Sequence, residues 1–294
     1  MGINVHQMVT DRIIAELEQG LIPWEKPWTG IRSGAYSRTT GKPYSFLNQM
    51  LLKKPGEYLT FKQATEAGGA IRKGEKAQIV VFWKPLPVKE KDKDGKEMQK
   101  MIPLLRYYNV FHIDQCEGIE AKYTPEDLKP ANPIEEAESI LAEYSTRSGC
   151  RIFHEKQDQA YYSPSRDQIH LPLREQFPRI EEYYSTAFHE ATHSTGHESR
   201  LNRLSKTAFF GDEAYSKEEL VAEMGAAMLM NTLGIETTGS FRNSAAYVQN
   251  WLHALRGDSK LVVSAAGKAE KAVRIIMNAD QIPTTLTGDE VLEG

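Results

Sequence analysis

The sequence has few cysteines and no long apolar run. Cys116 and Cys150 are its two cysteines, too few for a disulfide framework, as is usual in the reducing cytosol. No stretch approaches the roughly 20 apolar residues that are needed to cross a bilayer. The first residues show no apolar segment behind a basic start, so we expect no secretory signal peptide. These absences predict a cytoplasmic protein without a membrane partner.

Charge is unevenly distributed along the chain. The 294 residues carry a net charge of −4. Residues 1–125 hold 19 Lys or Arg against 14 Asp or Glu, whereas residues 126–294 hold 17 against 26. The length is comfortable for two domains, and the asymmetry favours two units with different partners, the first partner being anionic. The positive excess is modest, so charge alone leaves nucleic-acid binding as one of several interpretations.

The N-terminal half predicts a helix, a loop-rich stretch and a long β-hairpin. Apolar residues at helical spacing predict a helix over residues 5–20. Thr60 is a suitable cap for a second helix near residues 58–62. The apolar runs Gln78–Lys84 and Leu104–Ile113 predict two paired strands. The charge-dense residues 88–100 between them are expected to form a solvated hairpin tip or a flexible loop.

Three prolines within residues 124–133 predict a domain boundary. We therefore expect two domains, residues 1–125 and 126–294. The elements predicted for the second are a helix over 133–148, strands over 151–154, 159–162 and 167–171, and a helix over 182–195. The predicted fold class is α+β, and the long hairpin belongs to the N-terminal α+β domain.

The last of these helices contains a His-Glu-x-x-His motif at residues 189–193. Positions i and i+4 of a helix lie on one face, about 5–6 Å apart at Cβ. His189 and His193 can therefore ligate one Zn²⁺, and Glu190 is placed to act as the general base for an activated water. The alternative is a polar helix face with two solvated histidines. Small apolar neighbours such as Ala187 and Ala191 argue against it, because buried histidines need a partner.

A third ligand is expected from a second helix. A metzincin would carry a histidine at position 199, where this sequence has Ser199. Glu219 and Glu223 are four residues apart on a helix predicted over 217–230. We assign Glu219 as the ligand and Glu223 as the carboxylate that holds a ligating histidine by its other N–H. Glu218 lies about 100° away around this helix, so it is the less expected ligand.

Three protein ligands leave one metal position open, which is typical of catalytic and not of structural zinc. The order of helix, strands and motif-bearing helix is the usual prelude in the zincin fold, so we predict a zinc-dependent metalloprotease domain of the gluzincin type. Neighbouring first-row metals also suit such a site. Tyr215 precedes the ligand helix and is a candidate for contact with the oxyanion or the substrate.

Several runs together resemble the ArdC-type antirestriction proteins of conjugative plasmids. They are YYSTAFHEATHSTGHESRLNR (183–203), FGDEAYSKEELVAEMGAAML (210–229), GLIPWEKPW (20–28) and TTGKPYSFLNQMLL (39–52). The N-terminal part of conjugative-plasmid primases is similar too. The resemblance implies an N-terminal domain that binds single-stranded DNA, a C-terminal zincin domain with a bound metal, and protection of incoming conjugative DNA from host restriction. It leaves the protein substrate open, with a host restriction component as one candidate.

The residues of the N-terminal half fit this implication. Binders of single strands combine cations with aromatic platforms, and aromatic and basic residues interleave in two stretches. The candidate DNA contacts are Trp24, Trp28, Arg32, Arg38, Lys42, Tyr44, Arg72, Lys73 and Lys76. The alternative is that most of these aromatic rings belong to the core.

Three hypotheses follow. The first is a DNA-binding antirestriction protein with a working metalloprotease. The second is a DNA-binding module whose zincin domain is a non-catalytic scaffold. The third, a secreted protease, is disfavoured by the expected lack of a signal peptide. Glu190 favours the first, because a scaffold does not need a general base.

Overall fold

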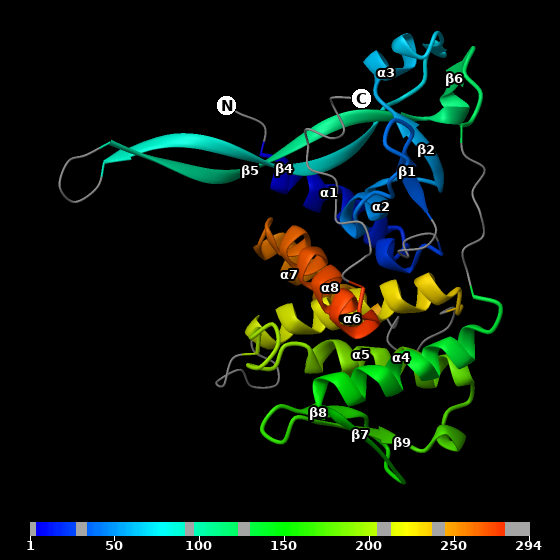
Figure 1. The fold of residues 1–294 in the computed structure, drawn as a ribbon, viewed down its shortest axis with the longest axis vertical. Coiled ribbons are helices and arrows are strands. Elements are labelled where there is room, and N and C mark those ends of the chain that lie inside the picture. Colours follow the sequence, from blue (N-terminus) through cyan, green and yellow to red (C-terminus); the bar gives the residue numbers. More distant parts are fainter. Residues whose placement is uncertain are drawn as a thin grey trace.

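The computed structural model describes residues 4–27, 34–91, 97–122, 130–204, 213–236 and 245–279. The side chains of residues 90, 91, 100, 213–215 and 245–247 are excepted. Figure 1 shows an N-terminal half from which a long two-stranded hairpin projects, above a helical C-terminal half with a small sheet at its lower face. The predicted α+β fold class is confirmed.

The N-terminal half is a mixture of short helices and strands around one long hairpin. Its helical elements are α1 (Val5–Glu18), η1 (Pro23–Glu25), α2 (Phe46–Leu51), α3 (Phe61–Glu66) and η2 (Ile113–Gln115). Its strands are β1 (Ala35–Ser37), β2 (Gly56–Leu59), β3 (Ala70–Ile71), β4 (Gln78–Lys91), β5 (Glu97–His112) and β6 (Cys116–Glu117). The main sheet has the order β1-β2-β5-β4. The predicted Thr60 cap is confirmed, since Thr60 and Gln63 form a capping box at the start of α3.

The hairpin is longer than expected. The register of β4 and β5 runs from Gln78 opposite Val110 to Lys91 opposite Glu97. Residues 88–91 and 97–100 therefore belong to the two strands, and the expectation of a loop is wrong for them. Val88 and Met98 stand among charged and polar residues there, which is compatible with a ribbon whose faces meet water.

In the C-terminal half, helices pack on a small three-stranded sheet. Its elements are α4 (Pro133–Ser148), β7 (Arg151–Glu155), β8 (Tyr161–Ser163), β9 (Gln168–Pro172), η3 (Arg174–Gln176), α5 (Ile180–Ser194), α6 (Glu213–Leu233), α7 (Ala245–Gly257) and α8 (Leu261–Met277). The sheet order is β7-β9-β8, with β7 and β9 parallel. Helix α5 lies against this sheet on one side and against α6 on the other. None of the described helices combines the length and apolarity that a membrane crossing requires.

One hydrophobic cluster extends through both halves of the chain. It joins Ile13 of α1 and Phe46 of α2 to residues of α5, α6 and α8. Trp24 packs edge-on against Trp251 of α7, with 5.1 Å between the ring centroids. The predicted boundary between residues 125 and 126 lies within residues 123–129, outside the described part of the chain, and it stays a prediction. The shared core means that unfolding of either half would expose apolar surface of the other.

Candidate metal centre

Helix α5 carries the His-Glu-x-x-His motif on a buried face. His189 and Glu190 are 4% and 5% exposed, and Phe188 next to them is fully buried. The 3.6-residue period brings the rings of His189 and His193 together, with 4.6 Å between their centroids. The local sequence thus forms a rigid helical platform that presents two imidazoles to the same point.

The chain turns back immediately after α5. The N–H of Gly196 bonds to the carbonyl of His193, and the N–H of Arg203 bonds to the carbonyl of Gly196. A Cβ on Gly196 would lie 2.8 Å from Cγ of Leu204, so the returning chain can pass this closely only beside a glycine. The turn therefore carries Arg203 back alongside the end of the motif helix.

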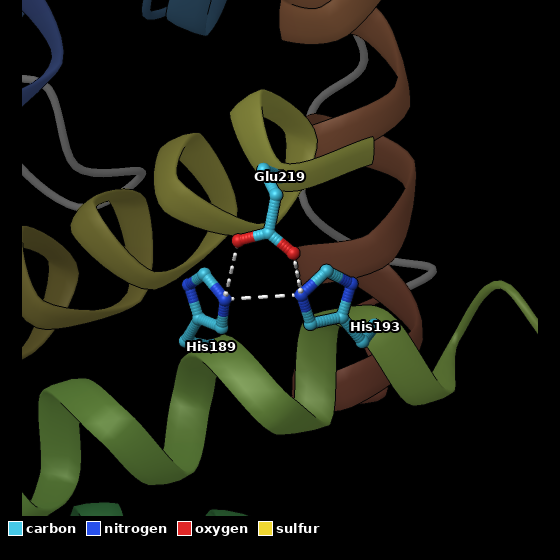
Figure 2. Close-up of side chains that lie close together, drawn as sticks. All are labelled: His189, His193 and Glu219. Carbon is cyan, nitrogen blue, oxygen red and sulfur yellow. Dashed lines mark hydrogen bonds and ion pairs between the residues drawn. The ribbon is translucent and has the colours of Figure 1, made fainter. Parts of the chain in front are cut away.

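Helix α6 crosses α5 and adds a carboxylate to the two imidazoles (Figure 2). Nε2 of His189 and Nε2 of His193 are 3.0 Å apart. The carboxylate oxygens of Glu219 lie 3.5 Å from Nε2 of His189 and 3.2 Å from Nε2 of His193. Neighbouring ligands of a tetrahedral ion with bonds of about 2.0–2.1 Å lie about 3.3 Å apart. The spacing of these three side chains therefore fits a divalent metal ion.

A second ring of contacts holds the two imidazoles by their other nitrogens. Nδ1 of His189 lies 3.2 Å from the carboxylate of Glu223, the residue predicted for this role. Nδ1 of His193 lies 3.7 Å from the carboxylate of Glu218. Such partners fix the tautomer and the orientation of a ligating histidine. Each histidine thus has a carboxylate on its far side.

Glu218 and Arg203 are the residues that sequence reasoning missed. Arg203 lies 2.8 Å from the carboxylate of Glu218, and its guanidinium also donates to the carbonyl of Thr192 and to Oγ1 of Thr195. The rotation of about 100° that made Glu218 the less expected ligand carries it to the outer nitrogen of His193. The sequence did hold a signal for Glu218, namely that it is adjacent to Glu219. Two neighbouring acids on one helix can contact the two ring nitrogens of one histidine, as Glu218 and Glu219 do at Nδ1 and Nε2 of His193.

The electrostatics of this cluster are dominated by its carboxylates. Burial alone would lower the pKa of His193, but the contacts with Glu218 and Glu219 outweigh burial and raise that pKa to about 10. Burial opposes ionisation of Glu219, yet the two histidines hold its pKa far below the usual range. Arg203 and His193 likewise lower the pKa of Glu218 against the effect of burial. A concentration of negative charge about two imidazoles is what a divalent cation would neutralise.

Family models match both halves of the chain, and solved structures match nearly all of it. Residues 135–268 match a zincin-like metallopeptidase, and residues 3–111 match the N-terminal domain of the anti-restriction factor ArdC. The crystal structure of antirestriction protein ArdC from plasmid R388 in its Mn(II)-bound form is 37% identical, with a TM-score of 0.74 over 95% of this chain and 99% of that one. This chain belongs to the ArdC family of antirestriction proteins. The metal-free crystal structure of the R388 protein matches with a TM-score of 0.72 at 36% identity and covers 99% of both chains.

Curated relatives extend the ArdC family to larger proteins. A DNA primase TraC of Escherichia coli is 36% identical over 94% of this chain, which spans 27% of the primase's length. An uncharacterized protein of Sinorhizobium fredii, y4eC, is 31% identical over 91% of this chain and 90% of its own length. The ArdC unit therefore occurs both as nearly a whole protein and as about a quarter of a primase.

The candidate DNA contacts of this ArdC-family chain fall into four groups. Trp24 and Tyr44 are 1% and 3% exposed. Both rings belong to the core, so neither can stack on a base, and the prediction of DNA contact is wrong for these two residues. Lys42, Lys73 and Lys76 are exposed.

The two described arginines of this set have protein partners. Arg38 pairs with the fully buried carboxylate of Glu57, and Arg72 donates to the backbone carbonyls of Asp114 and Cys116. Trp28, Arg32 and the side chain of Tyr215 lie outside the described residues. Lys42, Lys73 and Lys76 stay predicted phosphate contacts with exposed side chains.

Proposed function

We propose that this ArdC-family chain joins a metal-dependent peptidase to a half that binds single-stranded DNA, and that it protects incoming conjugative DNA from restriction in the bacterial cytoplasm. The observation that carries the peptidase proposal is the convergence of His189, His193 and Glu219 on one point beside a buried Glu190. Three protein ligands leave room for a water or a substrate oxygen, as catalytic sites do.

The residues have distinct roles in this proposal. His189, His193 and Glu219 hold the metal, and their two nitrogens and one carboxylate suit Zn²⁺, although neighbouring first-row ions fit too. The crystallised R388 relative held Mn(II). A divalent metal bound there supplies Lewis acidity, the means by which such sites activate water and polarise carbonyl groups near neutral pH.

Glu190 moves the proton. Its carboxylate accepts a proton from the water that attacks the amide carbon and passes it to the amide nitrogen as the C–N bond breaks. Glu223 and Glu218 keep the two imidazoles oriented. Tyr215 remains our candidate for contact with the oxyanion or the substrate. The protein substrate is open, and a host restriction component is the candidate that the family's antirestriction role favours.

The DNA proposal rests on the family and on the exposed cations of the N-terminal half. Lys42, Lys73 and Lys76 are exposed, and phosphate contacts from such lysines bind single strands without regard to sequence. The likeness to the N-terminal quarter of primases named TraC is compatible with a unit that meets single-stranded DNA. The alternative remains a DNA-binding module whose zincin domain serves as a scaffold.

Glu190→Gln separates the two possibilities. The variant keeps the shape of the side chain and all three metal ligands, so we expect metal content and DNA affinity equal to those of the wild type. Cleavage of an unfolded test protein, followed by mass spectrometry, should fall about 10²–10⁴-fold. Glu182→Gln on the same helix is the matched control and should retain activity.

Two results would count against the proposal. Equal cleavage by wild type and Glu190→Gln would refute the proton-transfer role of Glu190. Full protection of a transferred plasmid by Glu190→Gln, in a recipient with an active restriction system, would favour the scaffold.

A further inference from the structure

The hairpin of β4 and β5 carries most of the exposed large apolar side chains that the structure describes. Near the body, Phe82 and Leu105 are buried, because both faces of the ribbon meet a core there. Farther out the ribbon projects away from the body (Figure 1). Trp83, Leu86, Met98, Met101, Ile102 and Leu104 are 40–58% exposed. We call the part of the hairpin formed by residues 84–91 and 97–104 the arm.

Four of the five exposed large apolar side chains of the arm gather on one face, whereas Met101, opposite Pro87, lies on the other face. Residues directly opposite in an antiparallel pair share a face, and alternate pairs share the same one. Leu86 lies opposite Ile102, and Leu104 lies opposite Lys84 in the next pair of that face. Met98 follows on the same face toward the tip. An isolated two-stranded ribbon is marginal in water, so this face gains stability from a partner that covers it.

Prolines interrupt the edges of the arm next to the body. Pro85 lies opposite Pro103, and since neither has an N–H, this pair cannot be one of the hydrogen-bonded pairs of the ladder. Their nitrogens therefore face outward, and so does that of Pro87, two residues along β4. Pro85 and Pro87 remove two outward N–H donors from the β4 edge, and Pro103 removes one from the β5 edge, which disfavours an added strand there. The apolar face is therefore the better docking surface.

The composition of the arm favours a polypeptide over a nucleic acid. Residues 84–106 contain no Phe, Tyr, Trp or His, whereas single-strand binders stack bases on aromatic rings. Its leucine, isoleucine and methionine side chains are suited to pack against apolar side chains of another protein, the methionines because they adapt their shape. The arm itself holds four lysines, Lys84, Lys89, Lys91 and Lys100, against Glu90 and Glu97, and Lys89 pairs with Glu97. A partner of complementary chemistry carries acidic residues beside an apolar stripe.

We propose that the arm docks an acidic amphipathic helix of a partner protein on its Leu86/Ile102 face. From Leu104 to Met98 the strand extends about 20 Å at about 3.3 Å per residue, which matches a helix of about 13 residues at 1.5 Å each. The helix lays its apolar side chains on the aliphatic face, and its acidic flanks meet the lysines of the arm. This docking is independent of the metal site and of DNA binding.

The test uses the full chain and a synthetic 16-residue helical peptide with a leucine face and glutamate flanks. By fluorescence anisotropy we expect the wild type to bind the peptide, and the double variant L86S/I102S to bind at least 10-fold more weakly. Replacing the glutamates of the peptide by lysines should cost at least 10-fold, and salt should weaken the binding. Leu21→Ser and Phe61→Ser remove side chains that are 55% and 63% exposed away from the arm, and they should change affinity less than 2-fold.

A second readout locates the contact. With ¹³C-methyl methionine, the signal of Met98 should shift on titration with the peptide, while that of Met101, on the opposite face, should shift less. Circular dichroism should confirm that the variants are folded. Equal binding by wild type and L86S/I102S would overturn the proposal. The proposal would also be overturned if the wild type did not bind the peptide and L86S/I102S instead lost binding of an oligonucleotide. Loss of a dimer seen by light scattering in that variant, again without peptide binding by the wild type, would overturn it equally.

Discussion

Gly225 of α6 and Thr192 of α5 set the distance between the two helices of the metal centre. A Cβ built on Gly225 would lie 2.6 Å from Cγ2 and 2.7 Å from Oγ1 of Thr192. Real side chains do not approach so closely, and Thr192 is fixed by its bond to the carbonyl of Phe188. Glycine at 225 thus lets α6 come near enough for Glu219, less than two turns earlier, to meet the histidines.

Gly225→Ala should destabilise the protein by about 1–3 kcal/mol, because an overpacked helix contact must open, and it should also lower metal affinity. Thr192→Ala removes the atoms that the new methyl meets. The double variant should therefore lose less stability than the sum of the losses of the two single variants. Gly267→Ala on α8 is the matched control. It has open space around the new Cβ and should stabilise by about 0.5–1 kcal/mol. Urea titration provides the measurement, and a Gly225→Ala protein as stable as the wild type would contradict the close-packing account.

Glu218→Gln should lower metal affinity about 10–100-fold, the usual effect of losing a carboxylate behind a ligating histidine. Arg203→Met should act in the same direction, because it removes the cation that holds Glu218. Both are measured by competition with a chromophoric chelator. Glu236→Gln, just beyond α6, is the control and should bind metal as the wild type does. Affinities that match the wild type in both test variants would leave Glu218 without a positioning role.

Asp167 and Arg200 should make stability depend on acid pH. Arg200 bonds to Asp167 and to the carbonyl of Ser194 at the end of α5. Burial would raise the pKa of Asp167, but Arg200 and Tyr162 lower it below its usual value. A carboxyl whose folded pKa is depressed stabilises the fold above the unfolded value, about 3.9, and loses this contribution as pH falls through the folded pKa.

Asp167→Asn should therefore cost about 2 kcal/mol at pH 7, and its difference from the wild type should shrink below about pH 4. Asparagine tolerates the positive φ of 51° at this position, so the change isolates the charge. Thermal unfolding across pH 3–7 measures it, with Asp158→Asn at an exposed position as control. A constant difference between Asp167→Asn and the wild type over that range would argue against a role for ionisation.

Replacing Lys73 and Lys76 together by glutamine should weaken binding of single-stranded DNA and flatten its salt dependence. Each lost phosphate contact should reduce the slope of log K against log salt by about 0.7. Lys268→Gln, exposed on α8, is the control for net charge. An unchanged slope in the double variant would place the DNA elsewhere on the N-terminal half.

Trp24→Ala should instead destabilise the fold by about 3–5 kcal/mol, because its ring packs against Trp251 in the core.

What the sequence determined by itself is local. The period of an α-helix brings His189 and His193 to one face, and the four-residue spacing of Glu219 and Glu223 does the same on the next helix. These are consequences of backbone geometry. They hold wherever the element forms, and so they could be read from the sequence before any contact was known.

Only the tertiary structure decided which residues meet across elements. Glu218 reaches the outer nitrogen of His193, and Arg203 reaches Glu218, because Gly196 and Gly225 allow close approach of the returning chain and of α6. Trp24 and Tyr44 resembled stacking platforms in the sequence. They lie in the core because burying a large ring against other apolar side chains releases more free energy than leaving it in water, and that outcome depends on neighbours that the local sequence does not name.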